Sequence, residues 1–512
     1  MTLSRDSLEW AIEFVSDHSD GDLFPKIIEI NAVKEKSDLF INAVEGKDLS
    51  LFTPKPCRRF LVPKDEISYR QATQLHPQDS LLLSALIYQF GQGIEDRRLE
   101  KDRVFSYRFL PTLSDGLYSN KKAWNEFWQK ANRLASTASC ILYLDIADFY
   151  NQIYHHTVEN QLIASGFPNQ AIKWVISLLE STTAGVSRGV PIGPHPIHLI
   201  AESTLIPIDN SLESSGFNFI RFADDILIFC NSEKEAKSNL ATVASVLDKQ
   251  QRLMLQRHKT KIYKPGEFRT LCAEMVEDRP IDREEARLLG IIRRYTGGNP
   301  YQTISYNSIS DSDWSQFSTE VVSKIINEYL SQDDVDYIRL RWFYRRLAQV
   351  GHPGAIDVSL EKLDSLGPCL ANICFYISSI QNIEPEQWKN IGSKLLQLLE
   401  ADEVKENEFF RLSILSLFSR NEYINHFAHL SKIFNSSDSF ARREIMLSAF
   451  QNRAIDWLRE HKESFSNMDN WQRLAFVFCA SAFPKDEKKY FINRFDYDGP
   501  FEEVLSKWAK SI

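Results

Sequence analysis

The stretch of sequence that decides the fold is FNFIRFADDILIF, residues 217–229, in which two apolar runs flank Asp224 and Asp225. Short apolar runs rich in Phe and Ile predict two β-strands joined by a tight turn. Adjacent carboxylates at such a turn raise each other's pKa, because like charges at short range disfavour ionisation. Divalent cations compensate for that repulsion, so this hairpin predicts a metal site.

A third carboxylate precedes the hairpin in LYLDIADFY, residues 142–150, which predicts a strand that ends at Asp145. Carboxylate oxygens can bridge two Mg²⁺ ions about 4 Å apart, an arrangement that promotes in-line phosphoryl transfer. We therefore expect Asp145, Asp224 and Asp225 to be catalytic. We expect the same three residues and Ile146 to hold two Mg²⁺ ions, for which Mn²⁺ can substitute.

Two further segments have a fixed place relative to these carboxylates, one between Asp145 and the hairpin and one after the hairpin. RGVPIGP, residues 188–194, forms a turn with fixed and permissive backbone that could lie against a base pair or nucleotide, and LMLQRHKTKI, residues 253–262, follows the hairpin. Together the four segments resemble the palm motifs of reverse transcriptases: the DxxxFY strand, the GxPxG turn, the [YF]xDD hairpin and the LxLxxxKTxI element. The resemblance implies a polymerase that transfers nucleotides.

The resemblance extends upstream into the fingers of these enzymes, through RFLVPK (59–64), Tyr69 with Arg70, HPQDSL (76–81) and SYRF (106–109). It implies that Lys64 and Arg70 bind the incoming triphosphate, as a point charge and a bidentate fork. It also implies that Tyr150 packs under the sugar and rejects a 2′-hydroxyl. The implied dNTP-binding set is Lys64, Arg70, Asp148, Phe149, Tyr150, Pro191, Gly193 and Lys259, and the implied primer contacts are Phe222 and Ala223.

Some basic and imidazole side chains leave alternatives open. Lys259 and Lys261 compete for the role of a cation near the leaving pyrophosphate, and Lys259 is preferred. His155 and His156 could serve as a general acid, but a two-metal polymerase does not need one.

The sequence departs from the family pattern where a template is read. Ile192 stands where templated enzymes usually carry Gln, Phe222 replaces the commoner Tyr, and Pro196, His198 and Glu202 follow where Ser or Asn is usual. None of these changes affects the metal chemistry. They put template reading in doubt.

Net charge also argues against a long duplex footprint, since the chain carries −9 and has a pI near 5.8. A basic patch would have to be local. The candidates are Arg58, Arg59, Lys64, Arg70, Arg97, Arg98, Lys101, Arg103 and Arg108, with a solvated surface as the alternative. No apolar run is long enough to span a bilayer, and the seven cysteines contain no CxxC pair, which favours reduced thiols in a cytosol.

The fold class that we expect is α+β, with fingers and palm over residues 1–275 and an all-α domain over 276–512 in place of a thumb. Strand signals fade after about residue 282, and helices such as 338–350, 369–380 and 440–450 follow one another. Helix pairs recur at an offset of about 30 residues, which favours a HEAT-like repeat array. The aromatic residues of this half fall at helical spacing, which is more typical of core than of base stacking: Trp342, Phe343, Trp388, Phe409, Phe410, Trp457 and Trp471.

Three features together resemble the abortive-infection (Abi) reverse transcriptases of bacterial phage defence, the AbiK and AbiA group and their prophage-borne relatives. They are the RGVPIGP sequence of the turn, the Phe222 that precedes the two acids of the hairpin, and the all-α second half. This resemblance implies DNA synthesis from dNTPs without a template, and single-stranded product attached covalently to a tyrosine of the enzyme. It also implies a homo-oligomer, a trimer or hexamer, in the bacterial cytoplasm with no membrane partner.

A priming tyrosine has to reach the place of a primer 3′-hydroxyl. No tyrosine precedes Tyr69, so a primer at the extreme N-terminus is excluded. Tyr295, Tyr301 and Tyr306 are candidates by position, but none is assigned. Two alternatives stay open: a templated enzyme of the retron or group II intron kind, and an inert palm that supports a helical protein-binding scaffold.

Overall fold

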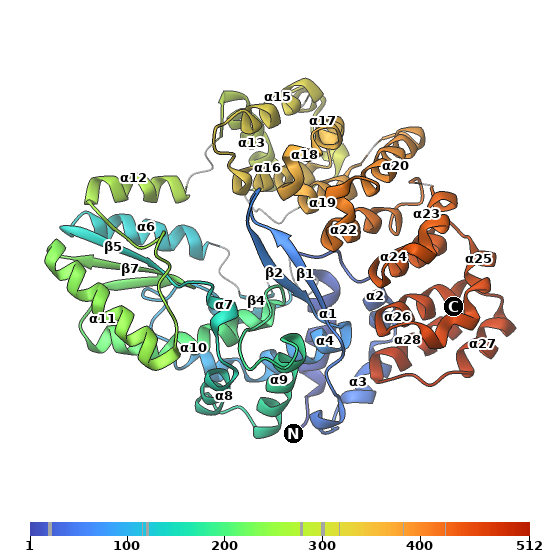
Figure 1. Ribbon diagram of the computed structural model, residues 1–512, viewed down its shortest axis with the longest axis horizontal. Helices are drawn as coiled ribbons and strands as arrows, with labels where there is room; N and C mark the ends of the chain where they lie inside the picture. Colours follow the sequence, from blue (N-terminus) through green and yellow to red (C-terminus); the bar gives the residue numbers. More distant parts are fainter. Residues whose placement is uncertain are drawn as a thin grey trace.

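A computed structural model describes residues 1–18, 23–114, 116–118, 122–276, 280–297, 303–316, 318–381, 383–424 and 426–512. Its first half mixes helices with three small sheets, and its second half is a curved row of helices (Figure 1). Among the described residues after Tyr263 there is no β-strand. The change from α+β to all-α is therefore where the apolar patterning indicated.

The palm sheet has four antiparallel strands in the order β6-β7-β5-β8. The strands expected at residues 141–144 and 226–230 are confirmed as β5 and β7. Their side chains alternate between two cores, because Ile141 and Leu227 pack toward α6 and α12 whereas Leu142 and Ile228 join the main core. The strands are β5 (Cys140–Asp145), β6 (Phe219–Phe222), β7 (Asp225–Cys230) and β8 (Lys261–Tyr263).

The helices of the first half cover this sheet or form the base of the molecule. Helices α6 and α12 pack on one face of the sheet, and α11 packs against β5 and β7 on the other. A short hairpin, β3 (Phe109–Thr112) with β4 (Gly116–Tyr118), lies beside them. The helices are α1 (Arg5–His18), α2 (Glu29–Glu35), α3 (Ser37–Val44), α4 (Pro77–Phe90), α5 (Gln92–Glu95), α6 (Ala123–Ala135), α7 (Phe149–Gln152), α8 (His155–Ala164), α9 (Asn169–Thr182), α10 (His195–Ser214), α11 (Glu233–Gln251) and α12 (Pro265–Val276).

The fingers are a single hairpin, β1 (Arg58–Pro63) with β2 (Tyr69–Gln74). Residues that pair across the hairpin share a face, so Phe60 with Ala72 and Val62 with Arg70 lie on one side. That side is buried against the helical half, where the Phe60 ring contacts Phe440 at a centroid distance of 5.2 Å. The opposite side of the hairpin faces solvent and a cleft.

The helical half is a continuous array in which α16, α19, α22, α24, α26 and α28 each pack against the next (Figure 1). The helices expected over 338–350, 369–380 and 440–450 are confirmed as α16, α19 and α24. The helices are α13 (Arg283–Thr296), α14 (Asp311–Trp314), α15 (Thr319–Leu330), α16 (Tyr337–Val350), α17 (Ile356–Glu361), α18 (Leu363–Leu366), α19 (Leu370–Ser379), α20 (Pro385–Leu399), α21 (Asp402–Lys405), α22 (Glu408–Phe418), α23 (Phe427–Ile433), α24 (Ser439–Gln451), α25 (Ile455–Glu460), α26 (Asn470–Cys479), α27 (Lys485–Asn493) and α28 (Pro500–Ser511).

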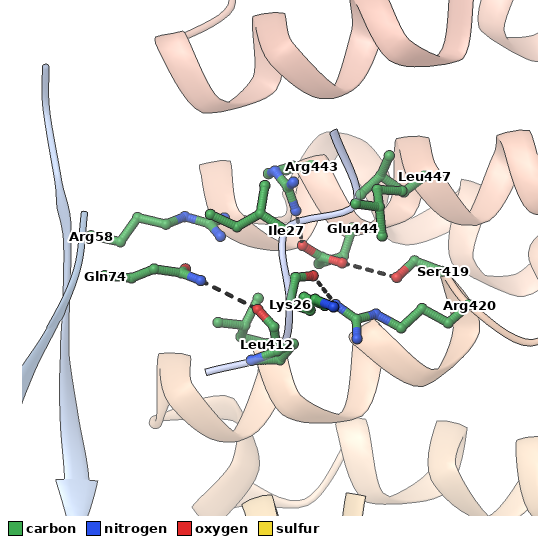
Figure 2. Close-up of a pocket in the computed structure, with 12 residues that line it drawn as sticks. Lys26, Ile27, Arg58, Gln74, Leu412, Ser419, Arg420, Arg443, Glu444 and Leu447 are labelled. Atoms are coloured by element: carbon green, nitrogen blue, oxygen red, sulfur yellow. Dashed lines mark hydrogen bonds and ion pairs between the residues drawn. The ribbon is translucent and has the colours of Figure 1, made fainter. Parts of the chain in front are cut away.

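The array closes back onto the first half at its far end, where α28 packs on α2, α3 and α4. A buried charge cluster also joins the two halves, because Arg443 of α24 donates to both carboxylate oxygens of Glu29 at 2.6 Å. Arg443 donates to Glu444 as well, and Glu444 accepts from the Ser419 hydroxyl at 3.0 Å (Figure 2). The guanidinium of Arg58 lies 4.6 and 4.5 Å from the ring centroids of Phe440 and Trp471. Arg58 is therefore buried structure, not part of a surface basic patch.

The remaining expectations about the core have mixed outcomes. Six of the seven cysteines are buried and all are free thiols. Of the seven aromatic residues expected in the core of the helical half, five are buried, Trp457 is half-buried against the core, and Trp342 has 43% of its surface exposed. No helix among the described residues is long and apolar enough to cross a bilayer.

Candidate active site

The strand register brings the three predicted carboxylates to one end of the palm sheet. Asp145 ends β5 directly opposite Asp225, the first residue of β7. The turn between β6 and β7 consists of Ala223 and Asp224, and the backbone N–H of Ile146 donates to the carbonyl oxygen of Asp224 at 3.1 Å. The backbone alone thus holds these residues adjacent.

Asp145 and Asp225 each contact one polar side chain. The Lys259 ammonium lies 2.6 Å from Asp145 Oδ2, and the Tyr143 hydroxyl donates to Asp225 Oδ1 at 2.8 Å. The competing Lys261 instead lies 2.8 Å from Glu267 Oε1. Of the two lysines, the structure therefore brings only Lys259 to the carboxylates.

Burial and mutual repulsion make ionisation of the paired acids costly. Burial and the charge of Asp145 raise the pKa of Asp224 to about 6, and burial and the charge of Asp224 raise that of Asp225 to about 7. Burial opposes the charged form of Lys259, but the ion pair with Asp145 outweighs it and raises the lysine's pKa. The site is thus short of positive charge.

A divalent metal fits this donor set by its chemistry. Hard cations take carboxylate oxygens, and the raised pKa values mark where added positive charge would be most stabilising. The described part of the chain holds no group of three acidic, His or Cys side chains already gathered as metal ligands. One oxygen of Asp145 accepts a hydrogen bond from Lys259, and one oxygen of Asp225 accepts a hydrogen bond from Tyr143.

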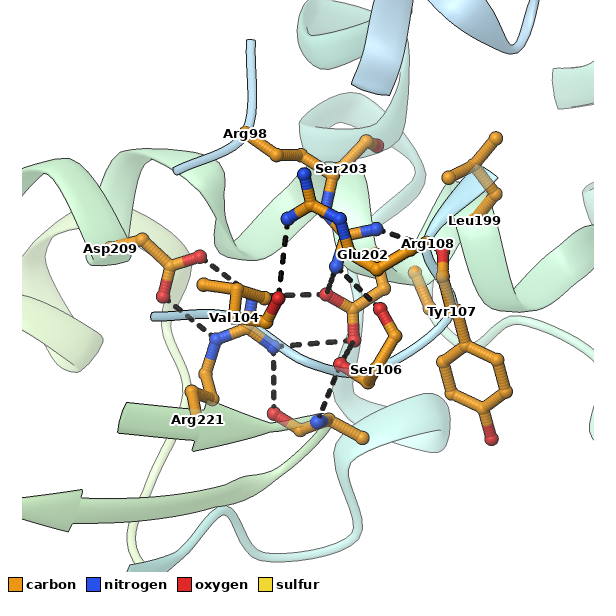
Figure 3. Close-up of polar contacts among 12 residues, drawn as sticks. Arg98, Val104, Ser106, Tyr107, Arg108, Leu199, Glu202, Ser203, Asp209 and Arg221 are labelled. Atoms are coloured by element: carbon orange, nitrogen blue, oxygen red, sulfur yellow. Dashed lines mark hydrogen bonds and ion pairs between the residues drawn. The ribbon is translucent and has the colours of Figure 1, made fainter. Parts of the chain in front are cut away.

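The hairpin turn is held from behind by a buried ion network centred on Arg221 of β6 (Figure 3). Its guanidinium donates to Asp209 at 2.7 and 2.6 Å, to Glu202 at 3.2 and 2.9 Å, and to the carbonyl oxygen of Ala223 at 2.9 Å. Ala223 has a left-handed backbone with φ of 50°. Such a conformation is strained for a residue with a Cβ, so the network stabilises the turn that presents the acids.

The SYRF segment is the second half of this network. Ser106 Oγ donates to Glu202 Oε1 at 2.7 Å and accepts from the Ala223 N–H at 2.9 Å. Arg98 donates to Glu202 at 2.8 Å, and Arg108 pairs with Glu95 at 2.7 Å. Arg98 and Arg108 are buried, so this part of the expected basic surface patch is wrong. Glu202, which departs from the family pattern, has a structural role here.

Tyr150 lies in an aromatic layer close to the acids. Its hydroxyl is 2.6 Å from His198 Nδ1, at the edge of the imidazole, and Tyr107 stacks on a face of the same ring with centroids 4.2 Å apart. Burial lowers the pKa of His198 to about 3, so the ring is neutral. The position of Tyr150 is therefore fixed by His198, a residue that sequence reasoning noted only as a departure.

An open cleft of about 360 Å³ separates the fingers from α7 and the 188–192 turn. Pro191 lies in it, and the Ile192 carbonyl oxygen accepts from the Thr73 N–H at 2.7 Å. Gly193 has φ of +135°, and a Cβ there would lie 2.7 Å from the Thr73 carbonyl oxygen. Glycine is therefore required where the turn meets β2. The cleft is lined by Arg59, Gln71, Thr73, Asp148, Asn151, Gln152, Thr182, Thr183, Val186, Arg188, Gly189, Val190, Pro191 and Ile192.

The structure separates the predicted triphosphate ligands. Lys64 is exposed at the fingertip, whereas Arg70 pairs with Val62 and so lies on the side of the hairpin that faces the helical array. The hairpin residues that do line the cleft are Arg59, Gln71 and Thr73, on its opposite side. Arg70 is thus not brought into the cleft with Asp148.

The other predicted residues are spread around the acids. Asp148 has a left-handed backbone and accepts from Asn151 at 2.7 Å, and Phe149 is buried. Phe222 packs on Trp124 with ring centroids 5.0 Å apart. The buried His155 donates from Nε2 to the Gly189 carbonyl oxygen at 2.8 Å, which leaves it structural.

Sequence reasoning missed the supporting residues Tyr143, Arg221 and Asp209. Tyr143 alternates with the buried residues of β5 on the side of the acids, a signal available once the strand is assigned. Arg221 is a charged residue inside an apolar run, which predicts a buried pair. Its partners on α10 could not be read from spacing.

Replacing Lys259 by Met should lower nucleotide incorporation about a hundredfold, because it removes the cation closest to the carboxylates. The matched control is Lys261→Met, which removes the same charge two residues away, where it pairs with Glu267. Single-turnover incorporation of a labelled dNTP measures both. Equal losses in the two variants would refute a specific role for Lys259.

Comparison with known proteins supports the polymerase assignment. Residues 62–292 match the family of reverse transcriptases, described as RNA-dependent DNA polymerases. No curated protein matches the chain. Solved structures similar to it include apo telomerase from Candida tropicalis, with TM-score 0.32 and 10% identity over 94% of this chain and 72% of that one. Telomerase from Candida albicans, in complex with a TWJ fragment of telomeric RNA, gives TM-score 0.30 and 11% identity over 74% and 70%.

Those TM-scores are too low to support any argument about fold or function, so the assignment depends on the family match and the site. The matched range contains β5, the β6–β7 hairpin and Lys259. The chain therefore contains a reverse transcriptase domain, and it is a nucleotidyltransferase of the RNA-directed DNA polymerase type.

Proposed function

We propose that this chain is a DNA polymerase that adds dNTPs without a template, primed by one of its own tyrosines, and that it acts in abortive-infection defence against phage in the bacterial cytoplasm. The observation that carries the proposal is the 191–193 turn. It is fixed to β2 through the Thr73 N–H and the Ile192 carbonyl oxygen, and it places the apolar residue Ile192 in the lining of the cleft, where templated enzymes usually carry Gln. That change removes a polar contact to the template.

The chemistry that we propose uses Asp145, Asp224 and Asp225 as ligands of two Mg²⁺ ions. Bound ions of this kind stabilise the attacking hydroxyl and the leaving pyrophosphate. Within the chain, Lys259 holds Asp145 in place and supplies positive charge near the leaving group. Tyr150, fixed by His198, blocks the space of a 2′-hydroxyl.

Protein priming limits which tyrosines can act. Tyr295 donates to Asp313 at 2.6 Å, and Tyr306 stacks on Trp314 with ring centroids 4.3 Å apart, so both are engaged. Tyr301 lies outside the described residues. Tyr69, on the cleft side of the fingertip, is 52% exposed. We assign the priming role to none of them.

The helical array has the place of a thumb in this proposal. Consecutive packing of α16 through α28 supports a HEAT-like solenoid, whose extended surface suits partners or further copies of the chain. We propose a homo-oligomer, trimer or hexamer, that carries its single-stranded product covalently.

The test is to incubate the purified chain with Mg²⁺ and labelled dNTPs in the absence of any nucleic acid. Label that enters DNA and stays with the protein after denaturation supports the proposal. Mass spectrometry of the nucleotide-linked peptide then identifies the priming residue. Synthesis only after a template-primer is added would overturn it.

A templated enzyme is the second candidate, since the matching family is described as RNA-dependent. The same experiment separates the two, because a templated enzyme copies the supplied strand and its product sequence follows that strand. An absence of synthesis in both conditions would favour the inert scaffold.

A further inference from the structure

Helix α16 is the part of the array that meets the fingertip. Tyr337, Arg341 and Arg345 are spaced by four residues and so lie along one side of the helix. The Tyr337 hydroxyl donates to Glu66 at 2.6 Å, and Arg341 donates to the carbonyl oxygens of Pro63, at 3.4 Å, and Lys64. This side of α16 therefore faces the β1–β2 turn.

Three guanidinium groups come together at this contact. Arg70 is on the array side of the hairpin, and burial and the charges of Arg341 and Arg345 lower its pKa. Within the described residues none of the three forms an ion pair with a carboxylate, and the buried Arg70 Nε has no hydrogen-bond partner. The nearby Asp65 carboxylate is hydrogen-bonded to Ser68. Uncompensated like charges of this kind are costly without an anion.

An exposed aromatic ring lies next to these arginines on the same helix. Trp342 follows Arg341 and precedes Arg345 by less than one turn, and 43% of its surface is exposed. The Arg346 guanidinium lies 5.0 Å from the Trp342 ring centroid. Much of the indole is therefore free to stack on a planar group.

We propose that Arg70, Arg341, Arg345 and Trp342 form a binding surface for single-stranded DNA, in which the arginines contact phosphates and Trp342 stacks on a base. The combination of a cationic patch with a stacking ring is the physical basis of single-strand binding. An indole can stack only on an unpaired base, and a patch this small on a chain of net charge −9 does not suit a duplex. That the strand is the chain's own product depends on the proposed function.

The experiment measures binding of fluorescein-labelled oligothymidylate, about 12 nucleotides long, by anisotropy without dNTPs. The host is the Asp224→Asn, Asp225→Asn chain, so that no self-made strand occupies the surface. Trp342→Ala should weaken binding about tenfold with an unchanged salt dependence. Arg345→Met should reduce the slope of log affinity against log salt by about 0.7, the value of one phosphate contact.

Two variants serve as controls. Arg339→Met removes a charge from the same helix, where it pairs with Asp336 at 3.1 Å, and Tyr490→Ala removes an aromatic residue of α27 that is 76% exposed. Both should bind as the host does, and melting temperatures should agree among all four variants.

Unchanged affinity and salt slope in Trp342→Ala and Arg345→Met would overturn this proposal, as would a host that binds no oligonucleotide at low salt. Equal losses in the controls would also overturn it, because the contact would then be nonspecific. Failure of untemplated synthesis is a separate result, since this binding requires no synthesis.

Discussion

Asp224→Asn combined with Asp225→Asn should abolish nucleotide incorporation and, in the absence of divalent ions, make the fold more stable. The loss of activity should be at least about a thousandfold, because two of three carboxylates at the reacting centre lose their charge. The gain in stability has the same origin. Burial and repulsion raise the pKa values of the two acids to about 6 and about 7, so their ionisation at neutral pH opposes folding.

The sign of the pH dependence follows from these shifts. Between about pH 4 and pH 7 the folded chain binds more protons at these sites than the unfolded chain, so the free energy of unfolding falls as pH rises. The Asn variant lacks both titrating carboxyl groups, so its free energy of unfolding does not show this fall. The stability advantage of the Asn variant should therefore be small near pH 4 and as much as about 7 kcal/mol at pH 8, because a difference of one pKa unit corresponds to about 1.4 kcal/mol.

Thermal melting in EDTA at the two pH values measures that difference. Added Mg²⁺ should raise the melting temperature of the unmodified chain and leave the variant unchanged, because a ligand stabilises only the state that binds it. Asp333→Asn with Asp334→Asn, two adjacent acids that are both exposed, is the matched control. Residual incorporation by the Asn variant, or an equal response of both chains to Mg²⁺, would refute the metal site.

Much of this site was predictable because its signals are local. Asp145 and Asp225 each adjoin an apolar strand, and antiparallel pairing of two such strands leaves few registers that put both acids at one end. The positions of Lys259 and Tyr150 relative to the acids depend on longer connections. Their identification relied on resemblance to a family, and the structure shows how Asp145 and His198 hold them.

The face on which Arg70 lies could not be predicted. A hairpin residue points to one of two sides, and the hairpin's own sequence does not say which side the array covers. For the same reason, the sequence could not show that several arginines of the expected basic patch are covered by other segments. Arg58 and Arg98 look like surface cations in sequence, but their aromatic and carboxylate partners come from segments far along the chain.

Trp342 was expected to be buried, but it is exposed. Its spacing places it beside apolar residues of α16, and a long helix in an array is usually covered on most sides. Helix α16 lies at the start of the array, where one of its sides contacts the β1–β2 turn. The adjacent side, which carries Trp342, is exposed to solvent. Periodicity predicts which residues share an arc, but not which arcs are covered.

Arg221→Met should be the most destabilising single change in the palm, costing about 3 to 5 kcal/mol in the free energy of unfolding. The side chain is fully buried and makes five hydrogen bonds, to Asp209, Glu202 and the Ala223 carbonyl oxygen. Methionine fills similar volume but leaves Asp209 without a cation. Glu202 keeps Arg98, so the unpaired charge is concentrated on Asp209.

Urea unfolding of Arg221→Met and of Arg221→Met with Asp209→Leu tests this reasoning. The second change removes the stranded carboxylate, so the double variant should recover part of the lost stability although one more residue is altered. Lys237→Met is the control, since Lys237 pairs with Glu233 on the surface and should cost less than about 1 kcal/mol. Activity should not recover with stability in the double variant, because Ala223 still lacks the guanidinium that holds its strained turn. Recovery of both together would mean that the network only stabilises the fold and does not position Asp224 and Asp225.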